Sequence, residues 1–346
     1  MKAAIFVEPG KMAVKEIDKP KIEKSTDAVI RILRACVCGS DLWWFRGISK
    51  REAGSTVGHE AIGIVEEIGD DVTAVHPGDF VIAPFTHGCG KCAACRAGFD
   101  GSCEERIENT NGGYQGEYLR FEHANWALVK IPGKPEDYTD AQLNNFLTLA
   151  DVMATGYHAA ASAEVKQGDT TVVIGDGAVG LCGVIGARLR GASRIILMSH
   201  HEDRAKLGRE FGATDIVSER GEDAVKKVME LTNGNGADSV LECVGATSAI
   251  EQAGQVARAG AVVGRVGVPQ TEPSSNTLFW KNIGLRGGIA SVTTYDKDIL
   301  LDAVLKGEIN PGKVFTKRFD LDHIQEAYEA MDKREAIKSL IIVADK

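Results

Sequence analysis

The sequence lacks long apolar runs and clusters of basic residues. A membrane-spanning helix needs about 20 consecutive apolar residues, and no stretch of the 346-residue chain approaches that length. The net charge is −9, and no group of lysines or arginines could follow the phosphates of a nucleic acid. The apolar stretch at the N-terminus is also too short for a secretory signal. We therefore expect a cytoplasmic protein that binds neither membranes nor nucleic acids.

Length and apolar patterning indicate two domains. One hydrophobic core usually stops growing at about 250–300 residues, and hydrophobic residues make up 44% of this chain, which is enough to fill two. Residues 1–153 and 290–346 predict a strand-rich, barrel-like domain, because short alternating runs there are broken by glycine and proline. In residues 154–289, buried strand runs alternate with helical stretches, which predicts a doubly wound parallel sheet. Near the C-terminus, residues 300–328 predict helices on both sides of a break at Pro311-Gly312, and residues 337–343 predict a last strand.

Four cysteines gather in one short loop, residues 86–106, with the pattern C-x2-C-x2-C-x7-C: Cys89, Cys92, Cys95 and Cys103. Zn²⁺ binds four thiolates in a tetrahedron, and the glycines of this loop allow it to fold tightly enough. Disulfides are the alternative, but cysteines separated by two residues rarely meet the geometry of that bond. A zinc site closed by four protein ligands stabilises the fold and leaves no position for a substrate. The chemistry is therefore expected elsewhere.

Cys38, His59 and Asp151 are candidates for a second, open zinc site. One thiolate, one imidazole and one carboxylate leave a fourth position for water or substrate, as catalytic zinc needs. Taken singly, each has another explanation, because Cys38 could be a buried thiol, His59 a hydrogen-bonded loop residue and Asp151 the start of a helix. Their combination with the cysteine loop and with a nucleotide-binding turn favours the metal site.

That turn is the segment Gly175-Asp-Gly-Ala-Val-Gly180, which follows an apolar strand and begins a helical stretch. A G-x-G-x-x-G pattern in this place is typical of dinucleotide binding. Gly175 would allow the tight turn, Gly177 the close approach of a pyrophosphate, and Gly180 the packing of helix on strand. A chain with 39 glycines could contain the pattern by chance, but its position between strand and helix favours a dinucleotide site.

The residues after the second strand of that sheet favour NADP(H) over NAD(H). An NAD site normally has a carboxylate there for the ribose 2′-hydroxyl, whereas this chain has Ser199 and His200. Ser199 can donate to a 2′-phosphate, and Arg204 offers a fixed positive charge. In the alternative, Glu202 or Asp203 reaches back to a 2′-hydroxyl, although acidic residues are also typical of a helix start.

Together these segments resemble the zinc-dependent medium-chain alcohol dehydrogenases. The resemblance extends over nearly the whole chain and includes Cys38-Gly-Ser-Asp41, Gly58-His-Glu60, the cysteine loop, Asp151-Val-Met-Ala-Thr-Gly-Tyr157, the glycine-rich turn and Val266-Gly-Val-Pro269. It implies an α/β fold with a Rossmann sheet and a GroES-like barrel domain, two zinc ions per subunit, and hydride transfer between an alcohol or ketone and a nicotinamide coenzyme. Many members have cysteine at position 151. This chain has Asp151 there, and in this it resembles the tetrameric, NADP-dependent secondary-alcohol dehydrogenases of bacteria.

The resemblance also implies roles for residues near the open metal site. Asp41 would hold the ring of His59, Glu60 would approach the metal or tune its field, and Ser40 would pass the alcohol proton toward the coenzyme ribose. In the alternative, Ser40 caps a short helix that starts at Asp41. Some relatives place an arginine on the pyrophosphate where this chain has Gly39, so backbone amides and Lys338 are expected to replace it. The remaining residues expected at the coenzyme are Thr155, Val179, Val266 and Val268.

Three bulky residues are expected to line an apolar substrate pocket, namely Trp43, Trp44 and Phe85. Of these, Phe85 matches a pocket aromatic of the family. Packing in a hydrophobic core is the alternative for each of them. An apolar wall favours a ketone or secondary alcohol over a polyol, which needs several hydrogen-bonding partners.

Three functions remain open from the sequence. The first is an NADP(H)-dependent zinc alcohol dehydrogenase, and the second is a polyol or amino-alcohol (threonine-type) dehydrogenase of the same fold. The third is a catalytically silent protein that senses a nucleotide or zinc. The strand runs at residues 260–266 and 278–289 could pair sheet edges between subunits, so we expect a homotetramer, with a dimer as the alternative.

Overall fold

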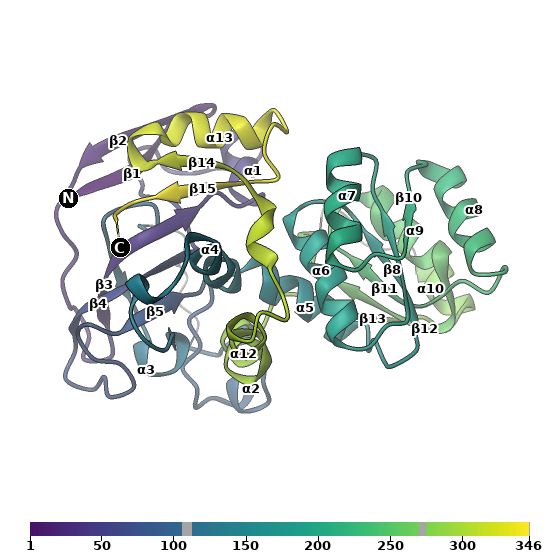
Figure 1. Ribbon diagram of the computed structural model, residues 1–346, viewed down its shortest axis with the longest axis horizontal. Coiled ribbons are helices and arrows are strands. Elements are labelled where there is room, and N and C mark those ends of the chain that lie inside the picture. The colour runs from purple at the N-terminus through teal and green to yellow at the C-terminus, as the bar shows by residue number, and fades with distance from the viewer. Residues whose placement is uncertain (106–112, 270–274, 346) are drawn as a thin grey trace. The chain divides into compact units, whose positions relative to one another are not determined.

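The computed structural model describes residues 1–105, 113–269 and 275–345, which form two compact units (Figure 1). Unit 1 comprises residues 1–151 and 291–346, and unit 2 comprises residues 152–290. Within the described residues, every helix is too short or too polar to cross a lipid bilayer.

The described residues of unit 2 include six strands: β8 (Thr170–Ile174), β9 (Arg194–Met198), β10 (Asp215–Val217), β11 (Ala237–Glu242), β12 (Ala257–Arg265) and β13 (Gly284–Gly287). They form one sheet in the order β10-β9-β8-β11-β12-β13, with every neighbouring pair parallel. The chain therefore starts in the middle of the sheet and winds outward first to one edge and then to the other. This strand order is that of a doubly wound dinucleotide-binding sheet, and the predicted fold class is confirmed.

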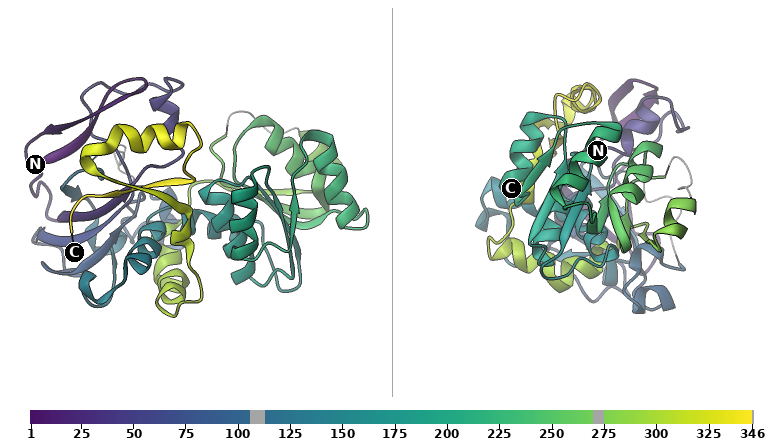
Figure 2. Two further views of the ribbon diagram at one scale, coloured as in Figure 1. Left: turned by 45° about the horizontal axis from the view of Figure 1, so that its top comes forward. Right: turned by 90° about the vertical axis from the view of Figure 1, so that its right-hand side faces the viewer.

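Helices cover both faces of this sheet. They are α5 (Val152–Ser162), α6 (Ala178–Leu189), α7 (Glu202–Phe211), α8 (Gly221–Leu231), α9 (Thr247–Val256) and α10 (Ser275–Trp280). The first three pack together on one face and the last three on the other (Figures 1 and 2). Because both faces are covered, the central strands β8 and β11 are largely buried, and Val172, Ile196 and Val240 belong to the hydrophobic core of this unit.

Unit 1 is rich in strands: β1 (Lys2–Glu8), β2 (Lys11–Glu16), β3 (Ala28–Cys36), β4 (Ala61–Ile68), β5 (Phe80–Ala83), β6 (Tyr118–Phe121), β7 (Val129–Lys130), β14 (Phe315–Asp320) and β15 (Lys338–Ile342). Strands β1 and β2 form an antiparallel pair, and the others form a seven-stranded sheet. One edge of β3 pairs with β4, and the other is shared between β6 and β15. The sheet therefore branches at β3, where two strands pair with different parts of the same edge. This agrees with the prediction of a strand-rich, barrel-like domain.

The helices of unit 1 are short: α1 (Asp41–Phe45), α2 (Ala93–Arg96), α3 (Ala124–Ala127), α4 (Asp140–Leu149), α11 (Val292–Tyr295), α12 (Leu301–Leu305) and α13 (Ile324–Asp332). A π-helical turn, Asp296–Leu300, joins α11 to α12. Helix α4 starts at a capping box in which Thr139 and Gln142 satisfy each other's backbone N–H groups. Helix α13 packs against β14 and β15 (Figure 2).

The prediction of helices in residues 300–328, around the break at Pro311-Gly312, is wrong for residues 315–320. The structure places strand β14 there, parallel to β15. Alternate residues of β14, among them Phe315 and Phe319, are half-buried, and the residues between them are exposed. This period of two is that of a strand with one covered face.

Candidate functional site

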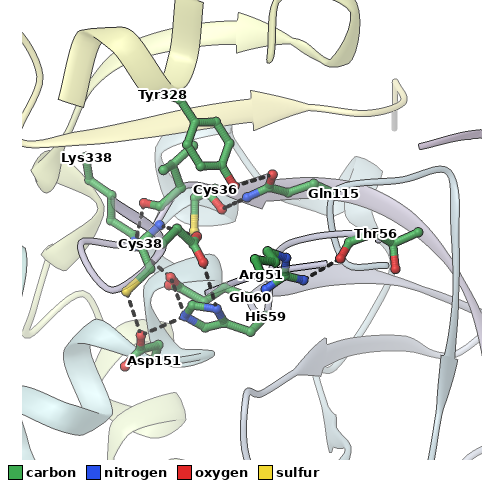
Figure 3. Close-up of polar contacts among 12 residues, drawn as sticks. Cys36, Cys38, Arg51, Thr56, His59, Glu60, Gln115, Asp151, Tyr328 and Lys338 are labelled. Atoms are coloured by element: carbon green, nitrogen blue, oxygen red, sulfur yellow. Dashed lines mark hydrogen bonds and ion pairs between the residues drawn. The ribbon is translucent and has the colours of Figure 1, made fainter. Parts of the chain in front are cut away.

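Three residues that are far apart in the sequence converge in unit 1. Cys38 follows β3, His59 precedes β4, and Asp151 follows α4. The Sγ atom of Cys38 lies 3.4 Å from Oδ2 of Asp151, and Nε2 of His59 lies 3.6 Å from the same oxygen. Figure 3 shows the three side chains pointing toward one another. With Glu60 they form a buried group whose ligand atoms all lie within 4.8 Å of one another.

The geometry and charge of this group fit zinc. Ligand atoms at ordinary zinc distances in a tetrahedron lie roughly 3.3–3.8 Å apart, which is the spacing around Asp151. Burial raises the pKa of the Cys38 thiol, and the carboxylate of Asp151 raises it further. Burial lowers the pKa of His59, but Asp41, Cys38 and Asp151 together raise it well above its ordinary value. The thiol and the imidazole thus hold their protons strongly in this site, and a divalent cation would bind these donors in place of the protons.

Asp41 lies where it can orient the imidazole of His59. One of its oxygens lies 3.5 Å from Nδ1 of His59, and the other accepts a 3.0 Å hydrogen bond from the backbone N–H of Cys38. The carboxylate is 4% exposed. It thus contacts the opposite side of the ring from Asp151, and it also fixes the backbone of Cys38.

Ser40 is exposed at the start of α1, and its side chain makes no capping hydrogen bond. The alternative expectation, a helix-capping hydroxyl, therefore has no support from the geometry. The transfer of a proton through Ser40 stays a prediction.

Lys338 and Glu60 form a buried contact that sequence reasoning missed. The Nζ atom of Lys338 donates to Oε1 of Glu60 at 2.7 Å and to the carbonyl oxygen of Val37 at 3.1 Å (Figure 3). Burial lowers the pKa of Lys338, but Cys36 and Glu60 raise it well above its ordinary value. The ammonium group therefore has partners inside unit 1, and its expected contact with a pyrophosphate stays a prediction.

The three bulky residues expected at the substrate differ in exposure. Trp44 is buried, its ring lies 5.2 Å from that of Phe6, and the Arg51 guanidinium lies 4.9 Å from its ring centre. Core packing explains Trp44 without a substrate contact. Trp43 and Phe85 are only half-buried, and the Phe85 ring lies 6.1 Å from that of His59. These two remain candidates for a pocket wall.

The four cysteines of the loop also converge. Their sulfurs lie within 4.8 Å of one another, and all four are free thiols, so the disulfide alternative is not realised. Three backbone N–H groups point at sulfurs, including that of Cys95, which donates to Cys92 at 3.4 Å. Hydrogen bonds of this kind lower the pKa of Cys92 to about 6 and so favour the thiolate that zinc binds. The loop fits a tetrahedral zinc ion with no open position.

The glycine-rich turn of unit 2 has the expected backbone. Gly175 adopts a φ of +107°, which only glycine reaches without strain. A Cβ atom on Gly180 would lie 2.0 Å from the carbonyl oxygen of Gly175, whereas one on Gly177 would meet nothing within 4 Å. The turn thus closes tightly on itself and leaves open space at Gly177, where the backbone can approach a pyrophosphate.

Residues expected at the 2′ position lie beside this turn. Ser199 follows β9, and its Oγ donates to Oδ2 of Asp176 at 2.9 Å. Nη1 of Arg204 lies 3.3 Å from Oδ1 of Asp176. Nδ1 of His200 lies 2.7 Å from the carbonyl oxygen of Ser218. Sequence reasoning missed Asp176, although it stands inside the glycine motif.

Four other residues expected at the coenzyme also belong to unit 2. Thr155 lies in α5 and Val179 in the first turn of α6. Val266 and Val268 follow β12, and Val268 is 57% exposed. Their contact with a coenzyme stays a prediction.

Known proteins match this chain along nearly its whole length. One family model, "Alcohol dehydrogenase GroES-like domain", matches residues 24–133, and another, "Zinc-binding dehydrogenase", matches residues 178–301. A zinc-type alcohol dehydrogenase B of Aspergillus flavus is 33% identical over 98% of this chain and 80% of its own. An NADP-dependent isopropanol dehydrogenase of Clostridium beijerinckii is 31% identical over 99% of this chain and 100% of its own. The solved structure of an alcohol dehydrogenase from Thermus sp. ATN1 superposes with a TM-score of 0.90 at 31% identity, over 99% of this chain and 100% of that one.

Proposed function

Because the chain belongs to the zinc-dependent alcohol dehydrogenase family, we propose that it transfers a hydride between NADP(H) and an apolar secondary alcohol or ketone. The family membership makes it an oxidoreductase that acts on alcohols.

The observation that supports the reaction most strongly is the convergence of Cys38, His59 and Asp151 on one buried position. These three residues would hold the catalytic zinc ion. When bound, zinc supplies Lewis acidity toward the oxygen of an alcohol or carbonyl group. The four cysteines of residues 86–106 would hold a second, structural zinc ion.

The residues around the metal position have three different roles: orienting a ligand, balancing charge and transferring a proton. Asp41 keeps the His59 ring oriented, so that Nε2 faces Cys38 and Asp151. Lys338 balances the charge of Glu60 beside the metal position. Ser40, whose hydroxyl is exposed and makes no cap, takes the proton from the alcohol and passes it on toward the coenzyme ribose or to water.

Separate observations support the coenzyme and the substrate assignments. Ser199 and Arg204 can bind a 2′-phosphate, and one relative at 31% identity is named as NADP-dependent and as acting on isopropanol. The half-buried rings of Trp43 and Phe85 favour an apolar substrate over a polyol.

The test is a substrate screen with purified, zinc-loaded protein. We expect NADP⁺-dependent oxidation of 2-butanol, with slower oxidation of sorbitol and threonine, and a higher kcat/KM with NADPH than with NADH. Faster turnover of sorbitol or threonine would favour the second function. Coenzyme binding without turnover of any alcohol or carbonyl compound would favour the silent protein.

We also propose a homotetramer, with a dimer as the alternative. Strand β13 lies at the edge of the unit 2 sheet, and all four of its residues are exposed, so its outer edge can pair with a strand of another chain. Analytical ultracentrifugation distinguishes the tetramer, the dimer and the monomer.

A further inference from the structure

The carboxylate of Asp176 contacts both Ser199 and Arg204, the two residues that are expected to bind a 2′-phosphate. Asp176 accepts a hydrogen bond from Ser199 through one oxygen, and its other oxygen lies 3.3 Å from the guanidinium of Arg204. The side chains of Asp176 and Arg204 are each 14% exposed, so both can reach a ligand at the surface of unit 2. One anionic side chain thus engages both candidate phosphate ligands.

The strand register explains why these residues meet. Strands β8 and β9 are parallel, and their last residues, Ile174 and Met198, are partners. Asp176 and Ser199 therefore leave the sheet at the same edge, one or two residues beyond each strand. Dinucleotides bind at the carboxyl ends of the strands in sheets of this kind. Asp176 accordingly lies on the side of the sheet where the adenosine ribose is expected.

The charge of Asp176 favours a hydroxyl over a phosphate at this position. A ribose 2′-hydroxyl can donate to a carboxylate, as it does in NAD sites. A 2′-phosphate carries negative charge and must displace Asp176 from Arg204 while it stays close to the same carboxylate. The Arg204–Asp176 distance of 3.3 Å is longer than the usual 2.7–2.9 Å, roughly, of charge-assisted hydrogen bonds, so the guanidinium is held loosely enough to turn toward a phosphate.

His200 is engaged with the backbone. Its Nδ1 lies 2.7 Å from the carbonyl oxygen of Ser218, and because a carbonyl only accepts, that nitrogen donates the hydrogen bond and is not available to a phosphate. Arg204 is thus the fixed cation for which a 2′-phosphate competes with Asp176.

We infer that Asp176 sets the coenzyme selectivity of this protein: its carboxylate accepts the 2′-hydroxyl of NAD(H) and competes with the 2′-phosphate of NADP(H) for Ser199 and Arg204. The inference rests on the proposed function, since it requires a nicotinamide coenzyme at this turn. Asp176 supplies, from the glycine motif, the carboxylate that the end of β9 lacks. The preference for NADP(H) is therefore smaller than Ser199 and Arg204 alone would produce.

The test is a binding measurement, independent of turnover. Isothermal titration of the wild type and of Asp176→Asn with NADPH and NADH gives the ratio of the two affinities. Asparagine keeps the shape of the side chain and removes its charge. In Asp176→Asn, NADH loses a hydrogen bond to a charged group, whereas NADPH loses an electrostatic repulsion. We therefore expect the ratio of the two affinities to shift toward NADPH by about 10- to 100-fold. Adenosine 2′,5′-bisphosphate and 5′-AMP, which lack the nicotinamide half, should show the same shift.

Two further variants complete the experiment. Asp203→Asn removes an exposed carboxylate from the first turn of α7 and should leave the ratio unchanged. Arg204→Gln should weaken NADPH more than NADH, and the effect of Asp176→Asn on NADPH should be smaller in that background.

The outcomes separate the inference from the proposed function. An unchanged affinity ratio in Asp176→Asn, or an equal shift in Asp203→Asn, overturns the role of Asp176 while alcohol turnover leaves the proposed function intact. A wild-type protein that binds neither coenzyme overturns both.

Discussion

The ammonium nitrogen of Lys338 lies 2.7 Å from a carboxylate oxygen of Glu60, and each side chain is 1% exposed. Removing one partner of such a pair leaves the other charge buried without compensation, which costs about 3–5 kcal/mol. We therefore expect Lys338→Met to lower the free energy of unfolding by roughly that amount, as measured by urea denaturation. The double variant with Glu60→Gln should recover a large part of the loss, because no unpaired charge remains.

A matched control is available at the surface. Lys317 pairs with Glu335 at 2.6 Å, with side chains 38% and 54% exposed. Because water screens this pair, Lys317→Met should lower the free energy of unfolding far less than Lys338→Met does. If Lys317→Met and Lys338→Met lowered the free energy of unfolding equally, burial of the Lys338–Glu60 pair would not explain the loss in Lys338→Met.

Asp151→Ala is expected to remove the catalytic zinc and leave the structural one. The variant deletes one of three converging ligands and does not alter the cysteine loop. Zinc content, measured by atomic emission, should fall from about two to about one per subunit, with loss of alcohol oxidation. Asp302→Ala, which removes an exposed carboxylate, should retain both ions. Full activity in Asp151→Ala would exclude Asp151 as a ligand.

Ser40→Ala should slow the reaction without loosening the fold. A positioned proton-transfer group contributes about 10²- to 10⁴-fold, so kcat should fall by about 100-fold or more while zinc content and NADPH affinity stay constant. Ser49→Ala, at an exposed position after α1, serves as the control. A fall in melting temperature with unchanged kcat would instead assign Ser40 to the helix start.

Asp296 should make stability depend on pH. Its carboxylate is 0% exposed, and neither oxygen has a hydrogen-bond partner among the described residues. Burial raises the pKa of this carboxyl well above its ordinary value, and the nearby Asp100 raises it further. The unfolded chain loses the proton at the ordinary pKa, whereas the folded chain keeps it. The contribution to stability is thus fully present at low pH and falls as pH rises from about 4 toward the folded pKa, by at most about 1.4 kcal/mol per pH unit.

Asp296→Asn removes this titration. The melting temperature of the variant, relative to the wild type, should therefore rise between pH 5 and pH 8. The control is Asp298→Asn, an exposed residue of the same π-helical turn, which should show no such trend. A difference between Asp296→Asn and the wild type that does not change with pH would contradict the raised pKa of Asp296.

Features that depend on local spacing could be predicted from the sequence. The cysteine loop was recognisable because its four thiols lie within one short segment, whose own turns bring the sulfurs together. The same holds for the turn from Gly175 to Gly180, where the backbone conformation of Gly175 and the close packing at Gly180 both require glycine. The strand content of both units also followed from periodicity, which is a local property. Strand β14 shows the limit of this reasoning, since it is a short strand within a region that otherwise forms helices.

Contacts between segments that are distant in the sequence could not be predicted from local spacing or periodicity. Strand β15 pairs antiparallel with β3, with Leu340 opposite Cys36, and this register brings Lys338 beside the loop that carries Cys38. No local pattern predicts that register, because it depends on how the whole sheet of unit 1 is assembled. The contact of Asp176 with Ser199 likewise depends on the alignment of two parallel strands.

The sequence by itself determined which chemical groups the protein possesses: two sets of metal ligands, a nucleotide-binding turn and a pair of candidate phosphate ligands. The tertiary structure determined which charged side chains lie beside these groups. It placed Lys338 against Glu60 and Asp176 against Arg204. The physical reason is that electrostatic interactions depend on distance and burial, and neither is determined by separation along the chain.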